Sequence, residues 1–429
     1  MEALIMAGGF GTRLSDITKG EIPKPMAIIA GKPIMEWAII CLKKYGVNNL
    51  YVSVSYLSEK IVEYFGDGSK FGVKINYIKE ETPLGSGGAL YYLKNKVSGD
   101  FIVCSGDTIF DINIKKMLAF HKKRKAKITL LTHPNNHPYD SDIILTDRND
   151  RVKGILLKNT HEQEYCKNNV NAGFFIISST TLDYFDTLKK VNMEHDFVLS
   201  VIKSGQKVCA YKSTEYIKDV GTPERFYKTQ GEIENGLVSA RNLQNKQKAI
   251  FLDRDGTINK YDGFINTPQK LELYDFSAQA IKKINQSGYL AIVVSNQPVI
   301  ARGEATFGQV EEIFDKMETL LGKEGAFVDA IFYCPHHPHK GFKGEVKRLK
   351  KECDCRKPKI GMLIKAQKKF NLDLSKCYIV GDSDLDVLTG INAGIKTVRI
   401  NSELNQESYV NSTYYANNLS QAVDLILSK

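Results

Sequence analysis

Paired carboxylates in the second half of the chain have the spacing that phosphoryl transfer requires. The apolar residues 249–252 are followed by Asp253, Asp255 and Gly256. One carboxylate can attack phosphorus, while the second, two residues later, can protonate the leaving oxygen and then activate water. A metal ion must screen the first acid from an anionic substrate. This stretch predicts a buried strand that delivers acids to a loop at its C-terminal end.

Other apolar runs in this half also end in polar groups. Residues 290–294 lead to Ser295 and Asn296, and residues 378–381 lead to Asp382. Between these runs, Arg356-Lys357-Pro358 supplies two cations. Because parallel strands present their carboxyl ends at one edge of a sheet, the pattern predicts one phosphate site built from several strand ends.

Glycine-rich turns mark the first half of the chain. The apolar residues 3–7 are followed by the turn Gly8-Gly9-Phe10-Gly11-Thr12-Arg13. Bare backbone N–H groups in such a turn can approach a phosphate closely, and a cation completes the cradle. Arg13 is one such cation, and Lys24, fixed between two prolines, is a second.

A second glycine-rich turn and two acids follow. The turn runs from Glu81 through Gly85 to Gly88, where we expect a helix to begin and a nucleotide base and ribose to lie against backbone. Asp107 ends the apolar run 101–104, and Asp219 lies far downstream in Asp219-Val220-Gly221-Thr222-Pro223. A carboxylate at a strand end is a natural ligand for Mg²⁺ beside phosphates.

The order of elements predicts an α/β protein with two Rossmann-like, three-layer domains. In the first half, apolar spacing predicts strands at 3–7 and 49–55 and helices at 37–45 and 59–65, a rhythm typical of a mostly parallel sheet. We expect a first domain over 1–241, a polar linker at 242–248 and a second domain over 249–429, which closes with a helix near 419–427.

Composition narrows the functional classes. The chain has 429 residues and a net charge of +10, but its basic residues are spread rather than gathered with aromatics on one face. We therefore expect anionic metabolites rather than nucleic acid as partners. No apolar run approaches the roughly 20 residues of a membrane helix, and no secretory signal is visible, so we expect a cytoplasmic location and no membrane partner.

Four residues of the second half form a candidate zinc site. Cys334 and His336 lie close together in sequence, as do Cys353 and Cys355. Three thiolates and an imidazole are a tetrahedral ligand set for structural Zn²⁺. Free thiols in a reducing compartment are the alternative, and a disulfide is a weaker one.

The first half resembles the sugar-1-phosphate nucleotidyltransferases over residues 1–240. The matching segments are Gly8-Gly9-x-Gly11-Thr12-Arg13-Leu14, Pro23-Lys24-Pro25-Met26, Leu84-Gly85, Gly106-Asp107, Asn171-Ala172-Gly173 and Asp219-x-Gly221-Thr222-Pro223. The resemblance implies that Arg13 steadies a triphosphate and Lys24 binds a sugar phosphate. It also implies that Asp107 and Asp219 bind Mg²⁺ and that Asn171 contacts the sugar. The resemblance also leaves open whether the chain forms a homo-oligomer through this domain.

One position departs from that family. Many relatives carry a Glu-Lys pair before the Asn-Ala-Gly segment, and its glutamate contacts the sugar hydroxyls. Here Leu157-Lys158 occupies the corresponding place. Lys158 remains a candidate substrate contact, but the carboxylate is missing, so this half does not identify the sugar.

The second half resembles the haloacid-dehalogenase superfamily of phosphotransferases and, more narrowly, D-glycero-D-manno-heptose 1,7-bisphosphate 7-phosphatases. The matching segments are Asp253-Arg254-Asp255-Gly256-Thr257-Ile258-Asn259, Val294-Ser295-Asn296-Gln297, Ile300-Ala301-Arg302-Gly303, the Cys-x-His loop, Cys353-Asp354-Cys355-Arg356-Lys357-Pro358 and Gly381-Asp382-Ser383-Asp384-Leu385-Asp386. Histidinol-phosphatases carry similar motifs.

This second resemblance implies a role for each motif residue. Asp253 would be the nucleophile and Asp255 the acid/base. Asp382, with Asp253 and Asp255, would bind Mg²⁺, and Asp386 would support the metal. The phosphate and substrate ligands would be Ser295, Asn296, Arg356 and Lys357.

Together the two resemblances indicate consecutive steps on one sugar. The second domain would remove the 7-phosphate of a heptose 1,7-bisphosphate, and the first would couple the heptose 1-phosphate to a triphosphate, GTP in the resembling guanylyltransferases. The product would be a GDP-heptose for surface polysaccharide. Two alternatives stay open: a mannose or hexose 1-phosphate transferase fused to another phosphatase, such as a histidinol-phosphatase, or a chain in which one domain only binds or regulates.

Overall fold

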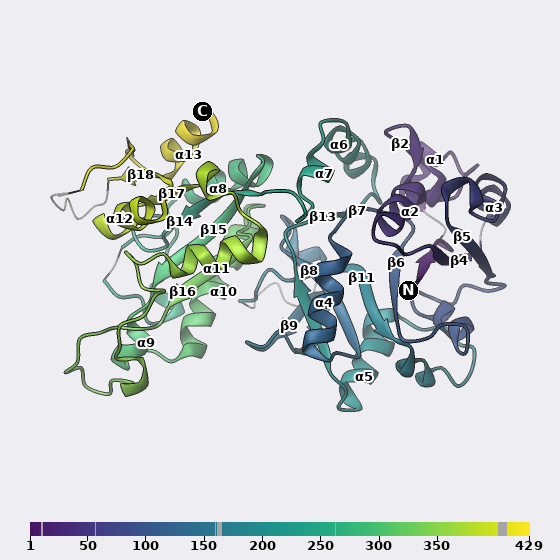
Figure 1. Ribbon diagram of the computed structural model, residues 1–429, viewed down its shortest axis with the longest axis horizontal. Coiled ribbons are helices and arrows are strands. Elements are labelled where there is room, and N and C mark those ends of the chain that lie inside the picture. The colour runs from purple at the N-terminus through teal and green to yellow at the C-terminus, as the bar shows by residue number, and fades with distance from the viewer. Residues whose placement is uncertain (10–11, 56, 159, 161–164, 262, 402–409) are drawn as a thin grey trace. The chain divides into compact units, whose positions relative to one another are not determined.

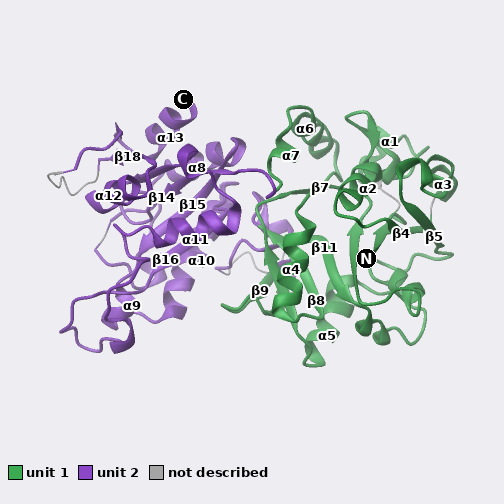
Figure 2. Ribbon diagram, viewed as in Figure 1, with its two compact units in different colours: residues 1–133, 144–156, 171–242 green, residues 134–143, 157–170, 243–429 purple. Residues whose placement is uncertain are grey.

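The structure is a computed structural model that describes residues 1–9, 12–55, 57–158, 160, 165–261, 263–401 and 410–429 (Figure 1). Its contacts divide the chain into two compact units (Figure 2). Unit 1 comprises residues 1–133, 144–156 and 171–242, and unit 2 comprises 134–143, 157–170 and 243–429. Two segments of the first half of the chain thus group with unit 2. The domain limits expected from the sequence stay a prediction.

A mixed, mostly parallel sheet forms the centre of unit 1. Its described strands are β1 (Glu2–Met6), β4 (Asn49–Val54), β5 (Lys74–Lys79), β6 (Asp100–Ser105), β8 (Ile128–His133), β9 (Ile143–Thr146), β10 (Val152–Leu156), β11 (Val170–Ser178) and β12 (Val208–Lys212). The main order is β10-β9-β11-β6-β1-β4-β5, with β8 pairing both β11 and β12. β1 pairs in parallel with β4 on one side and with β6 on the other, so the strand order changes direction at β1. Such a switch point is where open α/β sheets bind ligands.

Helices and small ladders complete unit 1. The described helices are α1 (Ser15–Thr18), α2 (Ile34–Lys44), α3 (Ser58–Phe65), α4 (Ile114–Arg124), α5 (Leu199–Lys203), α6 (Pro223–Glu234) and α7 (Leu237–Ala240). Two short antiparallel ladders pair β7 (Thr108–Asp111) with β13 (Tyr216–Asp219), and β2 (Ile28–Ile29) with β3 (Lys32–Pro33).

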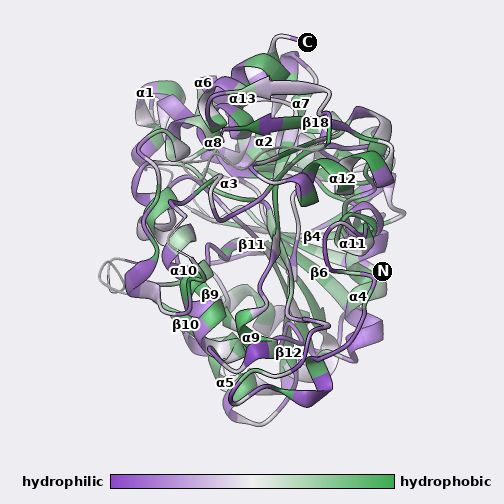
Figure 3. Ribbon diagram, turned by 90° about the vertical axis from the view of Figure 1, so that its left-hand side faces the viewer, coloured by the Kyte–Doolittle hydropathy of each residue, from purple (hydrophilic) through white to green (hydrophobic). Residues whose placement is uncertain are grey.

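Alternate side chains of these strands fill two separate cores. On β1, Ala3 and Ile5 pack with the apolar faces of α2, α3 and α4. Leu4 points to the opposite face, where it packs with a 3₁₀ turn (Gly88–Leu93) and α5. Because successive strand residues face opposite sides, the run without polar residues indicates a strand covered on both faces. The middle of β6, which neighbours β1, is likewise hydrophobic in Figure 3.

Unit 2 is built on an entirely parallel sheet. Its strands are β14 (Lys248–Leu252), β15 (Tyr289–Asn296), β16 (Ala330–Cys334), β17 (Tyr378–Gly381), β18 (Lys396–Ile400) and β19 (Tyr414–Ala416). The order is β16-β15-β14-β17-β18-β19, and each described pairing is parallel. β14 therefore lies at the switch point, between β15 and β17.

Helices cover both faces of this sheet, which gives three layers. They are α8 (Ser277–Gln286), α9 (Val299–Arg302), α10 (Phe307–Lys323), α11 (Gly361–Phe370), α12 (Asp384–Ala393) and α13 (Leu419–Leu427). Ile250 and Leu252 of β14 pack with α8, α10 and α13, whereas Ala249 and Phe251 pack with α11 on the other face. The α/β, three-layer prediction is confirmed.

Two segments from the first half of the chain pack on α10 within unit 2. Tyr139 donates its hydroxyl to the carbonyl oxygen of Thr319 at 2.8 Å, and the backbone N–H of Cys166 donates to the Thr319 hydroxyl at 3.1 Å. Gly322 leaves room for Pro138, since a Cβ there would lie 2.8 Å from the proline ring. These contacts explain why 134–143 and 157–170 group with unit 2.

The segment expected as a linker is well packed at its described ends. Asn242 is fully buried and donates to Asp111 at 2.6 Å and to Tyr45 at 3.0 Å. Gln247 is also buried, and its N–H donates to the carbonyl oxygen of Asn371 at 3.1 Å. The polar composition therefore indicated exposure correctly only for the middle of the segment, residues 244–246. None of the described helices is long and apolar enough to cross a membrane.

Candidate active sites

A buried lysine and two carboxylates meet in unit 1. Lys24 Nζ donates to Asp107 Oδ2 at 2.6 Å and to Asp219 Oδ1 at 2.9 Å. The lysine side chain is 7% exposed, whereas the two carboxylates are about one-third exposed. The acids thus balance the buried ammonium while an edge of each remains open to solvent.

Three elements bring these groups together. Lys24 opens a 3₁₀ turn, Lys24–Met26, whose entry is stiffened by Pro23. Asp107 lies between β6 and β7. The antiparallel ladder of β7 and β13 places Asp219 opposite Thr108, next to Asp107. The sequence expectation that these three residues share a site is therefore met by the geometry, although their roles stay a prediction.

The electrostatics favour an ionised Asp107. Burial raises the pKa of Asp107, but the charge and hydrogen bond of Lys24 outweigh burial and lower the pKa below its usual value. Arg225 adds a second cation, with Nη1 3.3 Å from Asp219 Oδ2. Asp107 and Asp219 therefore present carboxylate oxygens suited to a hard cation such as Mg²⁺.

The two glycine turns are joined by a glutamate that the sequence analysis did not single out. Glu80 is buried, and its Oε2 accepts from the N–H of Leu84 at 3.2 Å. A Cβ on Gly8 would lie 3.5 Å from Glu80 Oε1. The neighbouring Glu81, which the sequence favoured, is exposed. The buried and exposed residues of β5 do not alternate regularly, so the sequence offered no clear signal to distinguish the two glutamates.

The second turn needs its glycines for packing as well as for ligand access. Gly85 has φ +77°, and a Cβ there would lie 2.6 Å from the carbonyl oxygen of Val191. The N–H of Met193 donates to the Ser86 hydroxyl at 2.9 Å. The turn is thus fixed against residues 191–193. In the first turn, Gly9 and Arg13 are exposed. Gly11 and the side chain of Thr12 lie outside the part of the chain that the structure describes.

Asn171 is held at both ends of its amide. Its Nδ2 donates to Glu194 Oε1 at 2.8 Å, and its Oδ1 accepts from the N–H of Gly173 at 3.3 Å. Glu194 lies 23 residues further along, in the turn Met193–Val198, so no short motif could have indicated it. Lys158 is exposed, and its segment groups with unit 2.

A second lysine lies among the acids of unit 2. Lys357 Nζ is 2.8 Å from Asp253 Oδ1 and 2.5 Å from Asp386 Oδ1. Lys357 and Asp386 are almost fully buried, and Asp386 also accepts from the Ser383 hydroxyl at 2.5 Å. Burial alone would lower the pKa of Lys357, but the charges of Asp253 and Asp386 outweigh it and raise that pKa.

Three carboxylates of unit 2 form a candidate metal site. Asp253, Asp382 and Asp386 each offer an oxygen, and these atoms lie within 4.8 Å of one another. Burial and the charge of Asp386 raise the pKa of Asp382 to about 7, and burial and the same charge also raise the pKa of Asp253. Such crowding is relieved when a divalent cation binds. The carboxylate of Asp255 is not part of this group, although the sequence indicated it as a metal ligand.

The polar residues at the C-terminal end of β15 contact the same site. Ser295 is buried and accepts from Gln297 Nε2 at 2.9 Å, and the same nitrogen is 3.1 Å from Asp255 Oδ2. Asn296 exchanges two hydrogen bonds with the backbone of Lys357, at 3.0 and 3.2 Å. Asn296 therefore fixes the loop that carries the lysine. Arg356 donates to the carbonyl oxygen of His336 at 3.2 Å.

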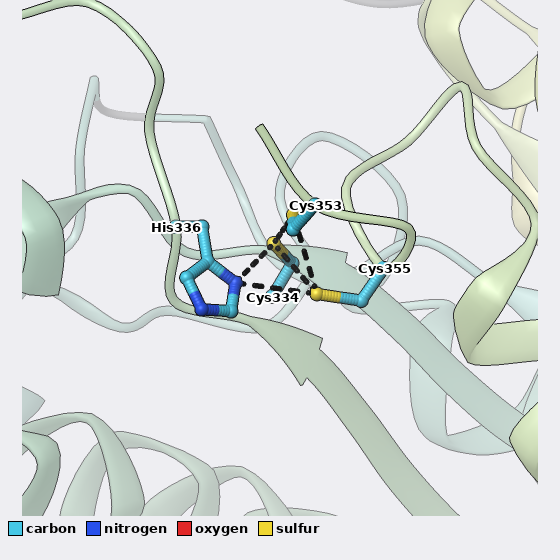
Figure 4. Close-up of side chains that lie close together, drawn as sticks. All are labelled: Cys334, His336, Cys353 and Cys355. Atoms are coloured by element: carbon cyan, nitrogen blue, oxygen red, sulfur yellow. Dashed lines mark hydrogen bonds between the residues drawn. The ribbon is translucent and has the colours of Figure 1, made fainter. Parts of the chain in front are cut away.

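The four residues expected to bind zinc converge (Figure 4). Cys355 Sγ lies 3.3 Å from Cys334 Sγ, 3.4 Å from Cys353 Sγ and 3.3 Å from His336 Nδ1. Cys334 Sγ is 3.6 Å from Cys353 Sγ. A disulfide needs an S–S distance near 2.05 Å, so none is formed. Ligands about 2.3 Å from a tetrahedral zinc lie about 3.8 Å apart, and the observed spacing is close to that value.

Two family models match this chain. A nucleotidyl transferase model matches residues 2–236, which is more than half of the chain, and a HAD-hydrolase-like model matches residues 354–422. Because the first model matches more than half of the chain, the chain belongs to the nucleotidyl transferase family. The two models and the relatives described next confirm both resemblances inferred from the sequence motifs.

Each half of the chain is similar to a different set of enzymes. The first half is similar to a D-glycero-α-D-manno-heptose 1-phosphate guanylyltransferase of Aneurinibacillus thermoaerophilus, with 32% identity over 55% of this chain and 99% of the relative. It is also similar to a mannose-1-phosphate guanylyltransferase of Mycobacterium tuberculosis, with 28% identity over 57% of this chain and 67% of the relative. The second half is similar to a D-glycero-β-D-manno-heptose-1,7-bisphosphate 7-phosphatase of Pasteurella multocida, with 41% identity over 35% of this chain and 79% of the relative.

Replacing Asp382 with asparagine tests the carboxylate crowding in the HAD-like unit. Because its pKa is raised from 3.8 to about 7, the folded, metal-free protein keeps a proton that the unfolded chain has released. The metal-free wild type should therefore lose stability relative to Asp382→Asn as the pH rises from about 4 to 7. Melting temperatures of both proteins in EDTA across this range measure the difference. An identical pH dependence for the two proteins would contradict the proposed repulsion.

Proposed function

We propose that this chain is a bifunctional enzyme of nucleotide-activated heptose synthesis. The HAD-like half removes the 7-phosphate of D-glycero-D-manno-heptose 1,7-bisphosphate, and the nucleotidyl transferase half couples the resulting heptose 1-phosphate to GTP. The observation that carries the proposal is that one chain joins a guanylyltransferase-like half to a bisphosphatase-like half. The relatives of both halves are named for phosphates of D-glycero-D-manno-heptose, the one a 1-phosphate and the other a 1,7-bisphosphate.

The phosphatase reaction proceeds in two displacements. A carboxylate oxygen of Asp253 attacks phosphorus, the bond to the sugar oxygen breaks, and Asp255 gives that oxygen a proton. Asp255 then takes a proton from water, whose oxygen attacks the phosphorus and breaks the bond to Asp253. Lys357, 2.8 Å from Asp253 Oδ1, is placed to balance charge as phosphate approaches the nucleophile.

The transferase reaction is a single displacement. A phosphate oxygen of the heptose 1-phosphate attacks the α-phosphorus of GTP, and the bond to the bridging oxygen of pyrophosphate breaks. Two anions must meet, so cations carry the catalysis. Lys24 and Arg13 supply them, and the glycine turns Gly8-Gly9-x-Gly11 and Leu84-Gly85 let backbone N–H groups approach the nucleotide.

Metal ions complete both sites in this proposal. Asp107 and Asp219 would hold Mg²⁺ in the transferase half, and Asp253, Asp382 and Asp386 would hold it in the phosphatase half, where it screens anionic oxygens. Structural Zn²⁺ would join the loop of Cys334 and His336 to that of Cys353 and Cys355. The spacing of their four ligand atoms supports zinc over free thiols.

The anomer decides whether the two halves work on one sugar. The transferase-like relative is named for an α-heptose and the phosphatase-like relative for a β-heptose. Neither reaction breaks the bond between the anomeric carbon and its oxygen, so the configuration of the bisphosphate passes unchanged into the product. Consecutive use of one sugar therefore requires both halves of this chain to accept the same anomer.

A second candidate function uses mannose 1-phosphate in the transferase half. The 28% identity with a mannose-1-phosphate guanylyltransferase favours it. The phosphatase half would then act on a different metabolite. Comparing kcat/KM for mannose 1-phosphate and both heptose 1-phosphates separates the two functions.

A two-substrate assay tests the main proposal. Purified protein, Mg²⁺, each anomer of the bisphosphate and each of the four nucleoside triphosphates are combined, and the products are identified by mass. We expect phosphate, pyrophosphate and a GDP-heptose from one anomer. Absence of phosphate with both anomers would exclude the bisphosphatase, and phosphate without pyrophosphate would exclude the coupled transferase.

Single substitutions should separate the two activities. Asp253→Asn removes the nucleophile and should lower phosphate release by more than about 10³-fold, while pyrophosphate release from heptose 1-phosphate and GTP is unchanged. Lys24→Ala should do the opposite, with a loss of about 10²–10³-fold in the transferase reaction. Each reaction is assayed alone with its own substrate. If either variant lost both activities while keeping its melting temperature, the two sites would not be independent.

Metal analysis tests the zinc site. We expect about one zinc per chain in the wild type and a clear loss in Cys355→Ser, because a serine hydroxyl is a poor zinc ligand. Cys377→Ala removes another buried thiol of the same unit, so it should keep its zinc and serves as the control. Elemental analysis by mass spectrometry after gel filtration gives the stoichiometry. Wild-type protein that contains no zinc after expression in zinc-supplemented medium would refute the assignment.

A further inference from the structure

The arginine between Asp253 and Asp255 in the sequence is completely buried. Arg254 is 0% exposed and is the largest fully buried side chain of the described residues. Its backbone N–H donates to Asp253 Oδ1 at 2.7 Å, and its guanidinium lies 5.1 Å from the centre of the Phe314 ring on α10. Removing a guanidinium from water is expensive, so a buried arginine needs a partner of opposite charge.

That partner is Asp255. Arg254 Nε donates to Asp255 Oδ1 at 2.9 Å, and Nη2 lies 2.8 Å from both carboxylate oxygens. Within the described residues this is the only ion pair of Arg254, and its Nη1 has no hydrogen-bond partner there. The guanidinium is therefore directed at Asp255 rather than shared with the metal-binding carboxylates.

Two neutral amides complete the surroundings of Asp255. Asn259 Nδ2 donates to Oδ1 at 3.1 Å, and Gln297 Nε2 donates to Oδ2 at 3.1 Å. Asn259 and Gln297 are both buried, whereas the Asp255 side chain keeps 20% exposure. The carboxylate is thus held from its buried side and remains accessible from the side of solvent.

The charges of the site explain why such a clamp is needed. Asp253, Asp382 and Asp386 with Lys357 leave two negative charges, which one divalent cation balances. A free Asp255 would add a third negative charge next to this group and would compete for the cation. When Asp255 is ionised, Arg254 balances its charge, so Asp255 then adds no net charge and stays outside the cluster.

We propose that Arg254 is a positioning residue that holds Asp255 apart from the metal-binding carboxylates and oriented for proton transfer. This inference rests on the proposed phosphatase function. Arg254 touches neither substrate nor metal in this role and acts through Asp255. Its effect should appear in the steps that move a proton, which are departure of the sugar oxygen and attack of water.

A double-substitution cycle tests the proposal. Arg254→Met, Asp255→Asn and the combined variant are compared for kcat and KM with the bisphosphate. We expect Arg254→Met to lower kcat by about 10²-fold or more with little change in KM, because proton transfer contributes about 10²–10⁴-fold. The combined variant should be no slower than Asp255→Asn alone. Losses that multiply in the combined variant would overturn the proposal.

The identity of the leaving group provides a second readout that a general structural defect would not reproduce. Nitrophenol from p-nitrophenyl phosphate is a good leaving group and needs little help from an acid, but hydrolysis of the aspartyl phosphate still needs the base. Rapid mixing should therefore give Asp255→Asn and Arg254→Met a burst of about one nitrophenol per site, followed by slow turnover. A folded Arg254→Met without a burst would show damage to Asp253 and overturn the proposal.

Matched variants guard against loss of fold. Lys283→Met removes a cation from an exposed ion pair of the same unit, with Asp424 at 2.6 Å, and should leave kcat unchanged. Arg254→Lys keeps the charge but not the fork, so it should restore part of kcat, and it decides the question if Arg254→Met does not fold. If wild-type protein releases no phosphate from the bisphosphate, the proposed substrate is wrong, and the burst with p-nitrophenyl phosphate alone decides the role of Arg254.

Discussion

Repulsion among crowded carboxylates is the constraint on which both candidate sites depend. In unit 2 three acids lie within 4.8 Å of one another, and in unit 1 two acids share one cation. Each group is kept together by a single buried lysine, Lys357 or Lys24. At such distances unpaired like charges repel strongly, so these acids need nearby cations, which are Lys357 in unit 2 and Lys24 with Arg225 in unit 1. The same remaining negative charge is what attracts a divalent cation.

The need to place one lysine accurately accounts for much of the surrounding structure. Lys357 lies on a loop, not on a strand, and reciprocal hydrogen bonds with Asn296 at the end of β15 fix the backbone of that loop. Lys24 is fixed instead by its prolines and by the 3₁₀ turn that it opens. Both solutions fix the backbone from which the long side chain starts, and burial and the ion pairs then order the side chain itself.

Sequence predicted the positions that follow directly from strand direction. Asp253, Ser295 and Asp382 come after apolar runs, and parallel pairing of β14 with β15 and β17 must bring such residues to one edge. What sequence could not supply was the direction of side chains in loops. It indicated Glu81, which is exposed and stays a prediction, but it singled out neither the buried Glu80 nor Glu194 beside Asn171. Asp255 was indicated as a metal ligand, yet its carboxylate pairs with Arg254, a contact between sequence neighbours that no spacing rule reveals.

Glycines beside the acids have a common physical origin that spacing alone did not show. A Cβ on Gly256, where φ is +75°, would lie 2.2 Å from Asp382 Oδ2, and one on Gly381 would lie 2.3 Å from Asp386 Cγ. In unit 1 a Cβ on Gly221 would lie 2.7 Å from Asp219 Oδ2 and 3.2 Å from Lys24 Nζ. In each case the missing side chain makes room for a carboxylate. Acid-glycine motifs in this chain therefore mark places where acids are packed against backbone, and this close packing is what makes a compensating cation necessary.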